Sequence, residues 1–217
     1  MDKKIFVLGA GGHASVLVDI LKQNELLVSG LFSPDSESKN NVLLGITLFK
    51  SEDDIFDHGS ETISLVNGIG SLPGTSLRSK LYDKFTQQGY LFQQVISKRS
   101  IISDFATLGK GVQVMPGAII QAGAVIGENS IINSGAIIEH DCLIGAHNHI
   151  APGVTLSGNV VTGNYVHIGT GANVIQSITI GDKAVIGAGA NVTKNISAGQ
   201  TAFGTSTEIK TRLEHES

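Results

Sequence analysis

Aliphatic side chains recur at every sixth position through the second half of this 217-residue chain. In the register from Ile102 to Val192, fifteen of sixteen positions hold Ile, Leu or Val, and Thr162 is the exception. A second series, four residues after each of these, is mostly small or β-branched, with Asn148 as its plainly polar member. A helix would scatter such a repeat over its surface, and a strand would show a period of two. The repeat therefore predicts a solenoid of triangular cross-section, with three units in each 18-residue coil and about five coils.

Aliphatic side chains must fill the interior of this solenoid, because the chain has no Trp and only 5% aromatic residues. Each inward side chain is expected to stack on its equivalent about 4.8 Å away in the next coil. Cys142 belongs to the inward series of small residues, so we assign it to the core. Glycines directly after the repeat aliphatic, such as Gly127 and Gly145, are expected where the backbone is tightly constrained.

Charge and cysteine content exclude several classes of protein. A net charge of −4 argues against nucleic-acid binding through basic patches. A single Cys excludes an internal disulfide framework and fits a reducing compartment. The apolar run near the N-terminus is about six residues long, too short for a signal-peptide core or a membrane span. We therefore expect a cytoplasmic protein with no membrane span.

Charged residues are unevenly distributed: residues 1–100 hold 21, residues 101–197 hold eight and the last twenty hold five. We predict a domain over 1–98, a β-helix over 99–198 and a tail over 199–217. The first domain reads as a small Rossmann-like α/β unit. Its strands are expected over 3–10, 26–32 and 63–68, with one helix after the first strand and another from Leu77 to Phe85.

A glycine-rich turn follows the first strand and opens the first helix. It reads Gly9-Ala-Gly11-Gly12-His13-Ala14, of the form G-x-G-x-x-G/A, which lets a phosphate approach amides at a helix N-terminus. The second mononucleotide half of a dinucleotide fold is missing, so NAD is disfavoured, and a plain tight turn is the alternative. The candidate substrate-binding residues in this first domain are Gly11, Gly12, His13, Asp35 and Gly70.

Polar residues gather in the middle of the charge-poor coils, in the segment NSGAIIEHDCLIGAHNH. His140 lies two residues after a repeat aliphatic and is expected to point outward, where an imidazole flanked by carboxylates can act as a general base. His149 precedes His167 by 18 residues, so the two should lie one coil apart. The alternative for each histidine is a surface or subunit-interface residue without chemistry.

The six-residue repeat resembles that of the hexapeptide acyltransferases, which implies a left-handed parallel β-helix after the Rossmann-like domain. GAGGHA, IIEHD and HNHIAPGVTLSGNV also resemble bacterial nucleotide-sugar N-acetyltransferases that modify UDP-4-amino-4,6-dideoxy sugars, and their perosamine and sialic-acid acetyltransferase relatives. The resemblance covers nearly the whole chain. It implies an acetyl-CoA-dependent enzyme, and a homotrimer with active sites between subunits.

This resemblance also implies roles for particular residues. His140 matches the general base that deprotonates the sugar amine, and Asp141 matches the carboxylate that orients it. His149 matches the histidine that contacts the thioester carbonyl. Gly158 matches the backbone donor to the oxyanion, and Asn133 matches the asparagine that contacts the sugar.

The glycine-rich coils that contain Gly169 and Gly187 offer a shallow edge for the pantetheine arm of acetyl-CoA. Lys194 is a candidate partner for its phosphates, as are Lys183 and Lys210. Family members commonly end the coils with G-x-P-A-[RK], whereas this chain reads AFGTSTEIK from Ala202. The contacts to the CoA adenine are therefore expected to differ from those of the family.

The preferred interpretation is acetylation of the 4-amino group of a UDP-linked amino-dideoxy sugar in bacterial glycan synthesis, with no metal. An O-acetyltransferase of the sialic-acid type is the main alternative. A zinc β-helix carbonic anhydrase is disfavoured. Two zinc ligands of that family are separated by whole coils, and no two histidines of the coils here are 36 residues, or two coils, apart. A non-catalytic nucleotide-sugar binder is a further alternative.

Overall fold

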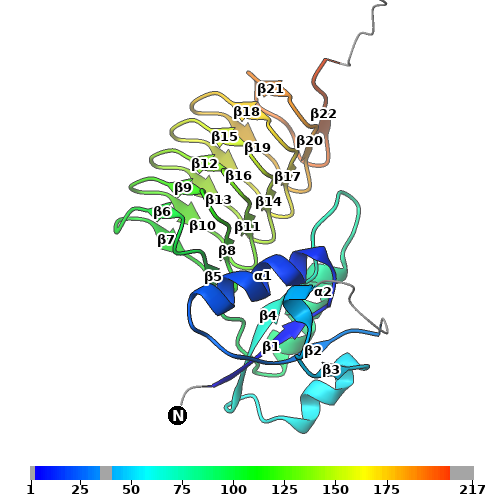
Figure 1. Cartoon of the computed structure of the whole chain (residues 1–217). Helices are drawn as coiled ribbons and strands as arrows, with labels where there is room; N and C mark the ends of the chain where they lie inside the picture. Colours follow the sequence, from blue (N-terminus) through cyan, green and yellow to red (C-terminus); the bar gives the residue numbers. More distant parts are fainter. Residues whose placement is uncertain (1–2, 35–40, 206–217) are drawn as a thin grey trace, which may run out of the picture.

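A computed structural model of the chain describes residues 3–34 and 41–205. A four-stranded parallel sheet with two helices leads into a stack of triangular coils that rises from one side of it (Figure 1). Within these two ranges no helix is long and apolar enough to cross a bilayer.

The N-terminal sheet is built around a strand that is buried over most of its length, as expected for a parallel strand covered on both faces. The strand order is β3-β2-β1-β4, and every pair is parallel. The predicted strands and helices are all present, whereas β3 and two short 3-10 helices were not predicted. The elements are β1 (Lys4–Leu8), α1 (Gly12–Gln23), β2 (Val28–Phe32), η1 (Asn41–Leu43), β3 (Leu48–Phe49), η2 (Glu52–Asp57), β4 (Ile63–Asn67) and α2 (Leu77–Gln87).

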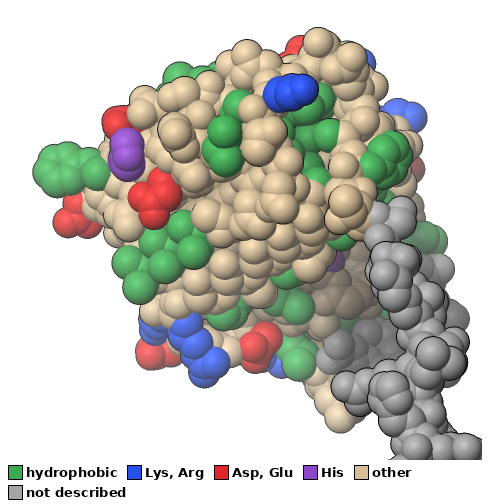
Figure 2. All heavy atoms as spheres, turned by 90° about the horizontal axis from the view of Figure 1, so that it is seen from above, with side chains coloured by type: hydrophobic (Ala, Val, Ile, Leu, Met, Phe, Trp, Pro, Cys, Tyr) green, Lys and Arg blue, Asp and Glu red, His purple; other side chains and the backbone are tan. Residues whose placement is uncertain are grey.

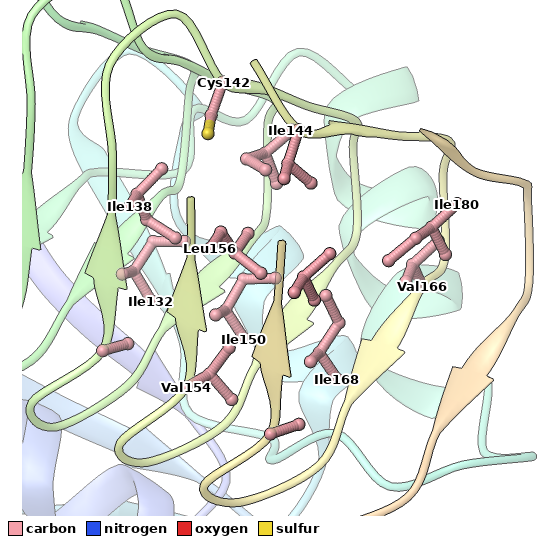
Figure 3. Packing of buried hydrophobic residues seen from close by; sticks show 14 of the residues in the cluster. Ile132, Ile138, Cys142, Ile144, Ile150, Val154, Leu156, Val166, Ile168 and Ile180 are labelled. Atoms are coloured by element: carbon pink, nitrogen blue, oxygen red, sulfur yellow. The ribbon is translucent and has the colours of Figure 1, made fainter. Parts of the chain in front are cut away.

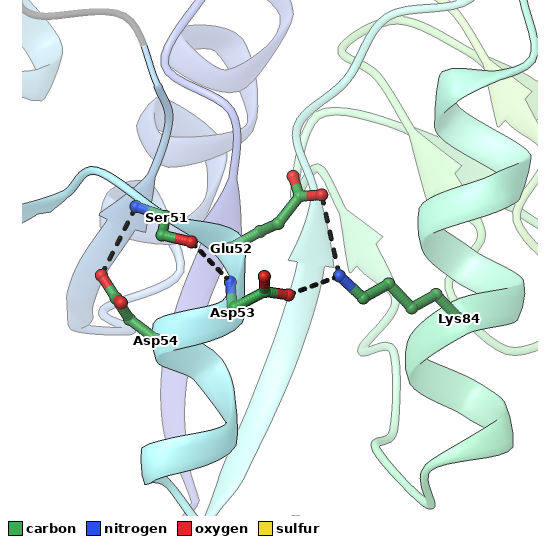
Figure 4. Close-up of polar contacts among 5 residues, drawn as sticks. All are labelled: Ser51, Glu52, Asp53, Asp54 and Lys84. Atoms are coloured by element: carbon green, nitrogen blue, oxygen red, sulfur yellow. Dashed lines mark hydrogen bonds and ion pairs between the residues drawn. The ribbon is translucent and has the colours of Figure 1, made fainter.

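Polar contacts tie η2 to α2 (Figure 4). The hydroxyl of Ser51 accepts from the N–H of Asp53 at 3.1 Å, and the N–H of Ser51 donates to Asp54 at 3.4 Å. Lys84 of α2 lies 2.7 Å from Asp53 and 3.8 Å from Glu52. Glu52 also lines the cavity at the glycine-rich turn after β1.

Strands of two residues alternate with turns in the coils, and nearly every strand pairs in parallel with the strand 18 residues further on, as His149 does with His167. Three parallel sheets result, one on each side of the triangle. Sheet I contains β5 (Val95–Ile96), β8 (Gln113–Val114), β11 (Ile131–Ile132), β14 (His149–Ile150), β17 (His167–Ile168), β20 (Val185–Ile186) and β22 (Thr201–Ala202). Sheet II contains β6 (Ile101–Ile102), β9 (Ile119–Ile120), β12 (Ile137–Ile138), β15 (Thr155–Leu156), β18 (Asn173–Val174) and β21 (Asn191–Val192). Sheet III contains β7 (Thr107–Leu108), β10 (Val125–Ile126), β13 (Leu143–Ile144), β16 (Val161–Thr162) and β19 (Thr179–Ile180).

The aliphatic series points into the coils and forms their core (Figure 3). Ile132, Ile138 and Ile150 have no exposed side-chain surface, and each such burial contributes roughly 1.5–3 kcal/mol. Cys142 is also fully buried, which confirms its assignment to the core. From above, the surface of the coils consists mainly of uncharged side chains and backbone (Figure 2).

The two exceptions to the repeat bind each other inside the coils. The amide of Asn148 donates to the Thr162 hydroxyl at 2.7 Å and to the Gly163 carbonyl at 2.9 Å. Its carbonyl oxygen accepts from the N–H of Val166 at 2.6 Å, and the N–H of Gly145 donates to Thr162 at 3.1 Å. The pair is therefore tolerated in an apolar core because its polar groups find partners there.

The glycines that follow the repeat aliphatics are explained by close approach between coils. A Cβ on Gly127 would clash with the backbone of Gly145, and a Cβ on Gly145 would clash with that of Gly163. Neither glycine has a positive φ, whereas Gly111 and Gly135 in the coil turns do. The first two glycines are required for space, and the last two for left-handed backbone.

The coils extend past both predicted bounds. β5 pairs with β8 inside the range predicted as 1–98, and β22 pairs with β20 inside the range predicted as 199–217. The register continues one step back to Ile96. At the other end the last coil is two residues shorter, since Val185 pairs with Thr201, so the six-residue count misses it.

Candidate active site

A cavity of about 500 Å³ lies at the glycine-rich turn after β1. The φ of Gly9 is +93°, and Gly11 precedes α1 with no side-chain cap on the helix N–H groups. A Cβ on Gly11 or Gly12 would meet no atom within 4 Å, so the space beside both residues is open. Four of the predicted substrate-binding residues line this cavity: Gly11, Gly12, His13 and Gly70. Of the other two, Asp35 lies outside the described residues, and Asn133 contacts His149 instead of lining this cavity.

His13 connects this cavity to the coils. Its Nε2 lies 2.8 Å from Oε1 of Gln113, and because that oxygen is an acceptor, Nε2 carries the proton. Gln113 is fully buried and donates in turn to the Asn67 carbonyl at 2.8 Å. Burial, and then the charge of Arg78, lower the pKa of His13 to about 4, so the ring is neutral near pH 7.

His149 and Asn133 meet on the outer face of sheet I. The Nδ1 of His149 lies 3.0 Å from the Ser71 carbonyl and donates to it, so Nε2 accepts from the Asn133 amide at 3.1 Å. Burial, followed by the neighbouring His167, lowers the pKa of His149 to about 4. The rings of His149 and His167 meet edge to face with their centroids 4.9 Å apart, and the two residues pair in adjacent coils, as predicted.

His140 occupies the turn between β12 and β13, at the edge where sheets II and III meet. Its Nδ1 lies 2.9 Å from Oδ2 of Asp141, and the two side chains are 58% and 59% exposed. The carboxylate accepts from Nδ1, which leaves the lone pair of Nε2 in the neutral ring free to take a proton. The ring lies directly over Gly158, where an added Cβ would be 2.5 Å from Cε1 and Nε2.

Asp141 is held by its own backbone as well as by this contact. Its φ is +59°, and its N–H donates to the Ala122 carbonyl at 3.1 Å. Its carboxylate lies over Gly123, where a Cβ would clash with Oδ1. The turn therefore presents at the surface an imidazole that is oriented by a neighbouring carboxylate.

The structure brings the predicted residues together as two groups. His140, Asp141 and Gly158 form one group at the edge between sheets II and III. Asn133 and His149 form the other, on sheet I, where His149 also contacts the carbonyl of Ser71. Sheet II separates the two groups within one chain. His140 and His149 are therefore close in the sequence but do not share a pocket in a single chain.

The three remaining predicted residues lie along the later coils. Gly169 and Gly187 both lie under a neighbouring segment: the backbone of Ala188 approaches the first, and Phe203 lies beside the second. Lys194 is exposed after β21. Packing alone explains the glycine at 169, because a Cβ there would lie 2.6 Å from the Ala188 nitrogen.

Sequence reasoning missed the contacts that join the first domain to the coils. Arg78 is buried and donates to the carbonyls of Asn67 at 2.8 Å, Ile69 at 2.7 Å and Asn129 at 3.2 Å. The amide of Asn129 bonds His147 at 2.9 Å, and the His147 ring stacks on Tyr165 at 4.8 Å. Asn129, His147 and Tyr165 follow one another at intervals of 18 residues. This spacing was the signal in the sequence that could have predicted their contacts.

Residues 3–34 and 41–205 contain no group of three or more His, Cys, Asp or Glu side chains suited to a metal ion.

Three family models match the chain: the PglD N-terminal domain over residues 4–85, the bacterial transferase hexapeptide over 123–158 and the hexapeptide repeat of succinyl-transferase over 166–194. A search of curated protein sequences finds no match.

Several solved structures resemble the chain over nearly its full length. PerB from Caulobacter crescentus, in complex with CoA and GDP-perosamine, is 31% identical, with a TM-score of 0.85 and coverage of 97% of this chain and 99% of its own. The acetyltransferase domain of PglB from Neisseria gonorrhoeae FA1090, in complex with acetyl coenzyme A, is 28% identical, with a TM-score of 0.86 and coverage of 94% and 97%. WeeI from Acinetobacter baumannii AYE is 25% identical, with a TM-score of 0.79 and the same coverage.

Fold and site together define an acetyltransferase with a Rossmann-like domain and a left-handed parallel β-helix of hexapeptide repeats. This confirms the predicted fold class and enzyme class. The chain belongs to the nucleotide-sugar N-acetyltransferase family of the perosamine and bacillosamine type.

Proposed function

We propose that this enzyme transfers the acetyl group of acetyl-CoA to the 4-amino group of a UDP-linked amino-dideoxy sugar. Its family membership and the relatives crystallised with CoA, acetyl coenzyme A and GDP-perosamine support a nucleotide sugar and acetyl-CoA as the two substrates. The choice of UDP rests on the sequence resemblance, and a GDP-linked sugar is the competing substrate of the same class.

The observation that carries this proposal is the exposed His140 ring, bonded through Nδ1 to Asp141 and lying over Gly158. The sugar nitrogen attacks the thioester carbonyl, and Nε2 of His140 takes the proton that the nitrogen loses. The new C–N bond forms, the C–S bond breaks, and the proton passes to the departing CoA thiolate. Asp141 acts as a positioning residue that stabilises the charged imidazole.

The oxyanion formed in this attack needs donors that are already in position. The N–H of Gly158, next to the ring of His140, is the donor that the family resemblance implies. The shallow edge along Gly169 and Gly187 is proposed to hold the pantetheine arm, and Lys194 one of its phosphates.

The nucleotide is proposed to bind in the cavity at the start of α1. The uncapped helix N-terminus and the open space over Gly11 and Gly12 support a diphosphate there. His13 and Gly70 line the same cavity, and Asp35 remains a candidate for the base or ribose. From this cavity the sugar would extend toward Asn133 and His149.

We further propose that a second copy of the chain completes the site in a homotrimer. Within one chain, His140 lies at the edge between sheets II and III, whereas Asn133 and His149 lie on sheet I. The two groups can act on one substrate only if an edge of one subunit faces sheet I of its neighbour.

The test is release of free thiol from acetyl-CoA by the purified protein, with UDP-linked and GDP-linked 4-amino sugars as acceptors. We expect acetylated amino sugar, and His140→Ala should lower turnover by roughly 10²–10⁴-fold. The variant should keep the wild-type mass in light scattering and its affinity for CoA, so that lost assembly is distinguished from lost chemistry. Turnover near that of wild type would remove His140 from this role, and acetylation of hydroxyl acceptors alone would favour the O-acetyltransferase alternative.

A further inference from the structure

A second cavity of about 500 Å³ lies between the segment 71–80 and the edge of the coils where sheets III and I meet. The coil side of this cavity includes Asn129, His147, Tyr165 and Lys183, which follow one another at intervals of 18. All four have a left-handed backbone, with φ between 54° and 59°. They are the corner residues of four successive coils, so the stacking of the coils places them in one column along the cavity.

The charge of this cavity is one-sided. Among the described residues that line it are three cationic side chains, Arg78, Lys80 and Lys183, and no Asp or Glu. Hydroxyl groups add donors: Ser71, Thr75, Ser76, Ser79 and Tyr165. This is the opposite of the whole chain, which carries a net charge of −4. The cavity therefore favours an anion.

Arg78 contributes a charge that no carboxylate offsets among the described residues. Its hydrogen bonds go to backbone carbonyls only, those of Asn67, Ile69 and Asn129. Burial lowers the pKa of Arg78 to about 9, which still leaves the guanidinium charged at neutral pH. A buried charge without a counterion is costly, and an anion in the adjoining cavity would offset that cost.

A second buried group lacks a partner at the same place. Nδ1 of His167 is shielded from solvent, and no hydrogen-bond partner for it is present in the described part of the chain. His167 lines this cavity, whereas His13 lines the glycine-rich one. A ligand in the cavity that reaches this nitrogen would supply the missing partner.

We propose that this cavity binds a phosphate-bearing ligand at a site separate from the glycine-rich cavity. The two cavities share no lining residue, and the segment 71–76 lines only the second one. Lys80 on α2 and Lys183 on the coils approach from opposite walls, an arrangement suited to the several oxygens of a phosphate or diphosphate. The volume falls in the range that holds a small organic ligand rather than a single ion.

The phosphate could come from CoA or from a separate phosphorylated metabolite. The first source rests on the proposed function, because it requires CoA as co-substrate. The second source does not depend on the proposed function, and it would make the cavity an effector site near the active site.

The first experiment titrates inorganic pyrophosphate into the full-length protein by calorimetry. We expect saturable binding that weakens at least tenfold in the double variant Lys80→Ala, Lys183→Ala. Lys98→Ala is the matched control: this exposed lysine lies 3.8 Å from Glu25, outside the cavity, and its variant should bind as wild type does. Absence of saturable binding, or equal affinity in the double variant and wild type, overturns the proposal.

Histidine NMR on the same samples locates the anion. Pyrophosphate in the proposed site should shift the ring signals of His147 and His167 and leave that of His13 unchanged. A shift of His13 alone means that the anion sits in the glycine-rich cavity, which also overturns the proposal.

Two further ligands identify the source of the phosphate. If CoA supplies the phosphate, CoA should compete with pyrophosphate and should bind the double variant more weakly than wild type. Pantetheine, which has no phosphate, should not compete, and the double variant should bind it as wild type does. If CoA does not compete, a separate metabolite is the source. Because these are binding measurements, they stand even if the protein fails to acetylate an amino sugar.

Discussion

Replacing Gly158 with Ala tests whether the position of the His140 ring, as distinct from its presence, controls acetyl transfer. An alanine Cβ would lie 2.5 Å from Cε1 and Nε2 of that ring, whereas ordinary contacts begin near 3.4 Å. The ring must therefore move by about 1 Å, and such a misplacement of a catalytic group can cost about 10²-fold in rate. The backbone N–H at position 158 is retained, so the proposed oxyanion donor is still present.

The same substitution should affect stability very little. The φ of Gly158 is not positive, so alanine adopts this backbone without strain. The group that must move is the end of a side chain that is 58% exposed, and it can swing into solvent. We expect a change in unfolding free energy below about 1 kcal/mol, because surface changes that break no buried contact fall in that range.

The assay compares turnover of wild type, Gly158→Ala and the neighbouring control Ser157→Ala, with urea unfolding of each. We expect the Gly158 variant to lose about two orders of magnitude in turnover, and Ser157→Ala to stay near wild type. Turnover of the Gly158 variant within threefold of wild type would refute the reasoning, since the ring would then be displaced without consequence.

The coils could be predicted in detail because their physics is local and periodic. A six-residue count identified which side chain of each strand is buried, and an 18-residue count placed His149 against His167. The two departures from the pattern were visible as well. Their explanation, that Asn148 and Thr162 bond each other inside the coils, required coordinates.

The candidate site could be predicted only in part, because it depends on contacts between distant segments. His13 forms a hydrogen bond with Gln113, one hundred residues away, and His149 forms one with the carbonyl of Ser71. No local pattern encodes such pairs. His140 and His149 are nine residues apart in the sequence, yet the first lies in the turn between β12 and β13 and the second lies in β14 on sheet I.

Two further predictions concern the contacts that join the domains. Arg78→Met should destabilise the chain by roughly 2–4 kcal/mol in urea unfolding, because three buried carbonyls lose their donor while only one desolvated charge is removed; a loss below 1 kcal/mol would contradict this. The second prediction follows from the pKa values of His13 and His149, both lowered to about 4, below the unfolded value of 6.5. Between pH 4 and 6.5 the unfolded chain binds more protons than the folded chain does. The free energy of unfolding therefore falls as the pH falls, by about 2 kcal/mol per histidine from pH 7.5 to 5. Urea midpoints at the two pH values measure this loss. His13→Gln with His149→Gln should flatten it, and an unchanged slope would show that neither ring is held neutral by folding.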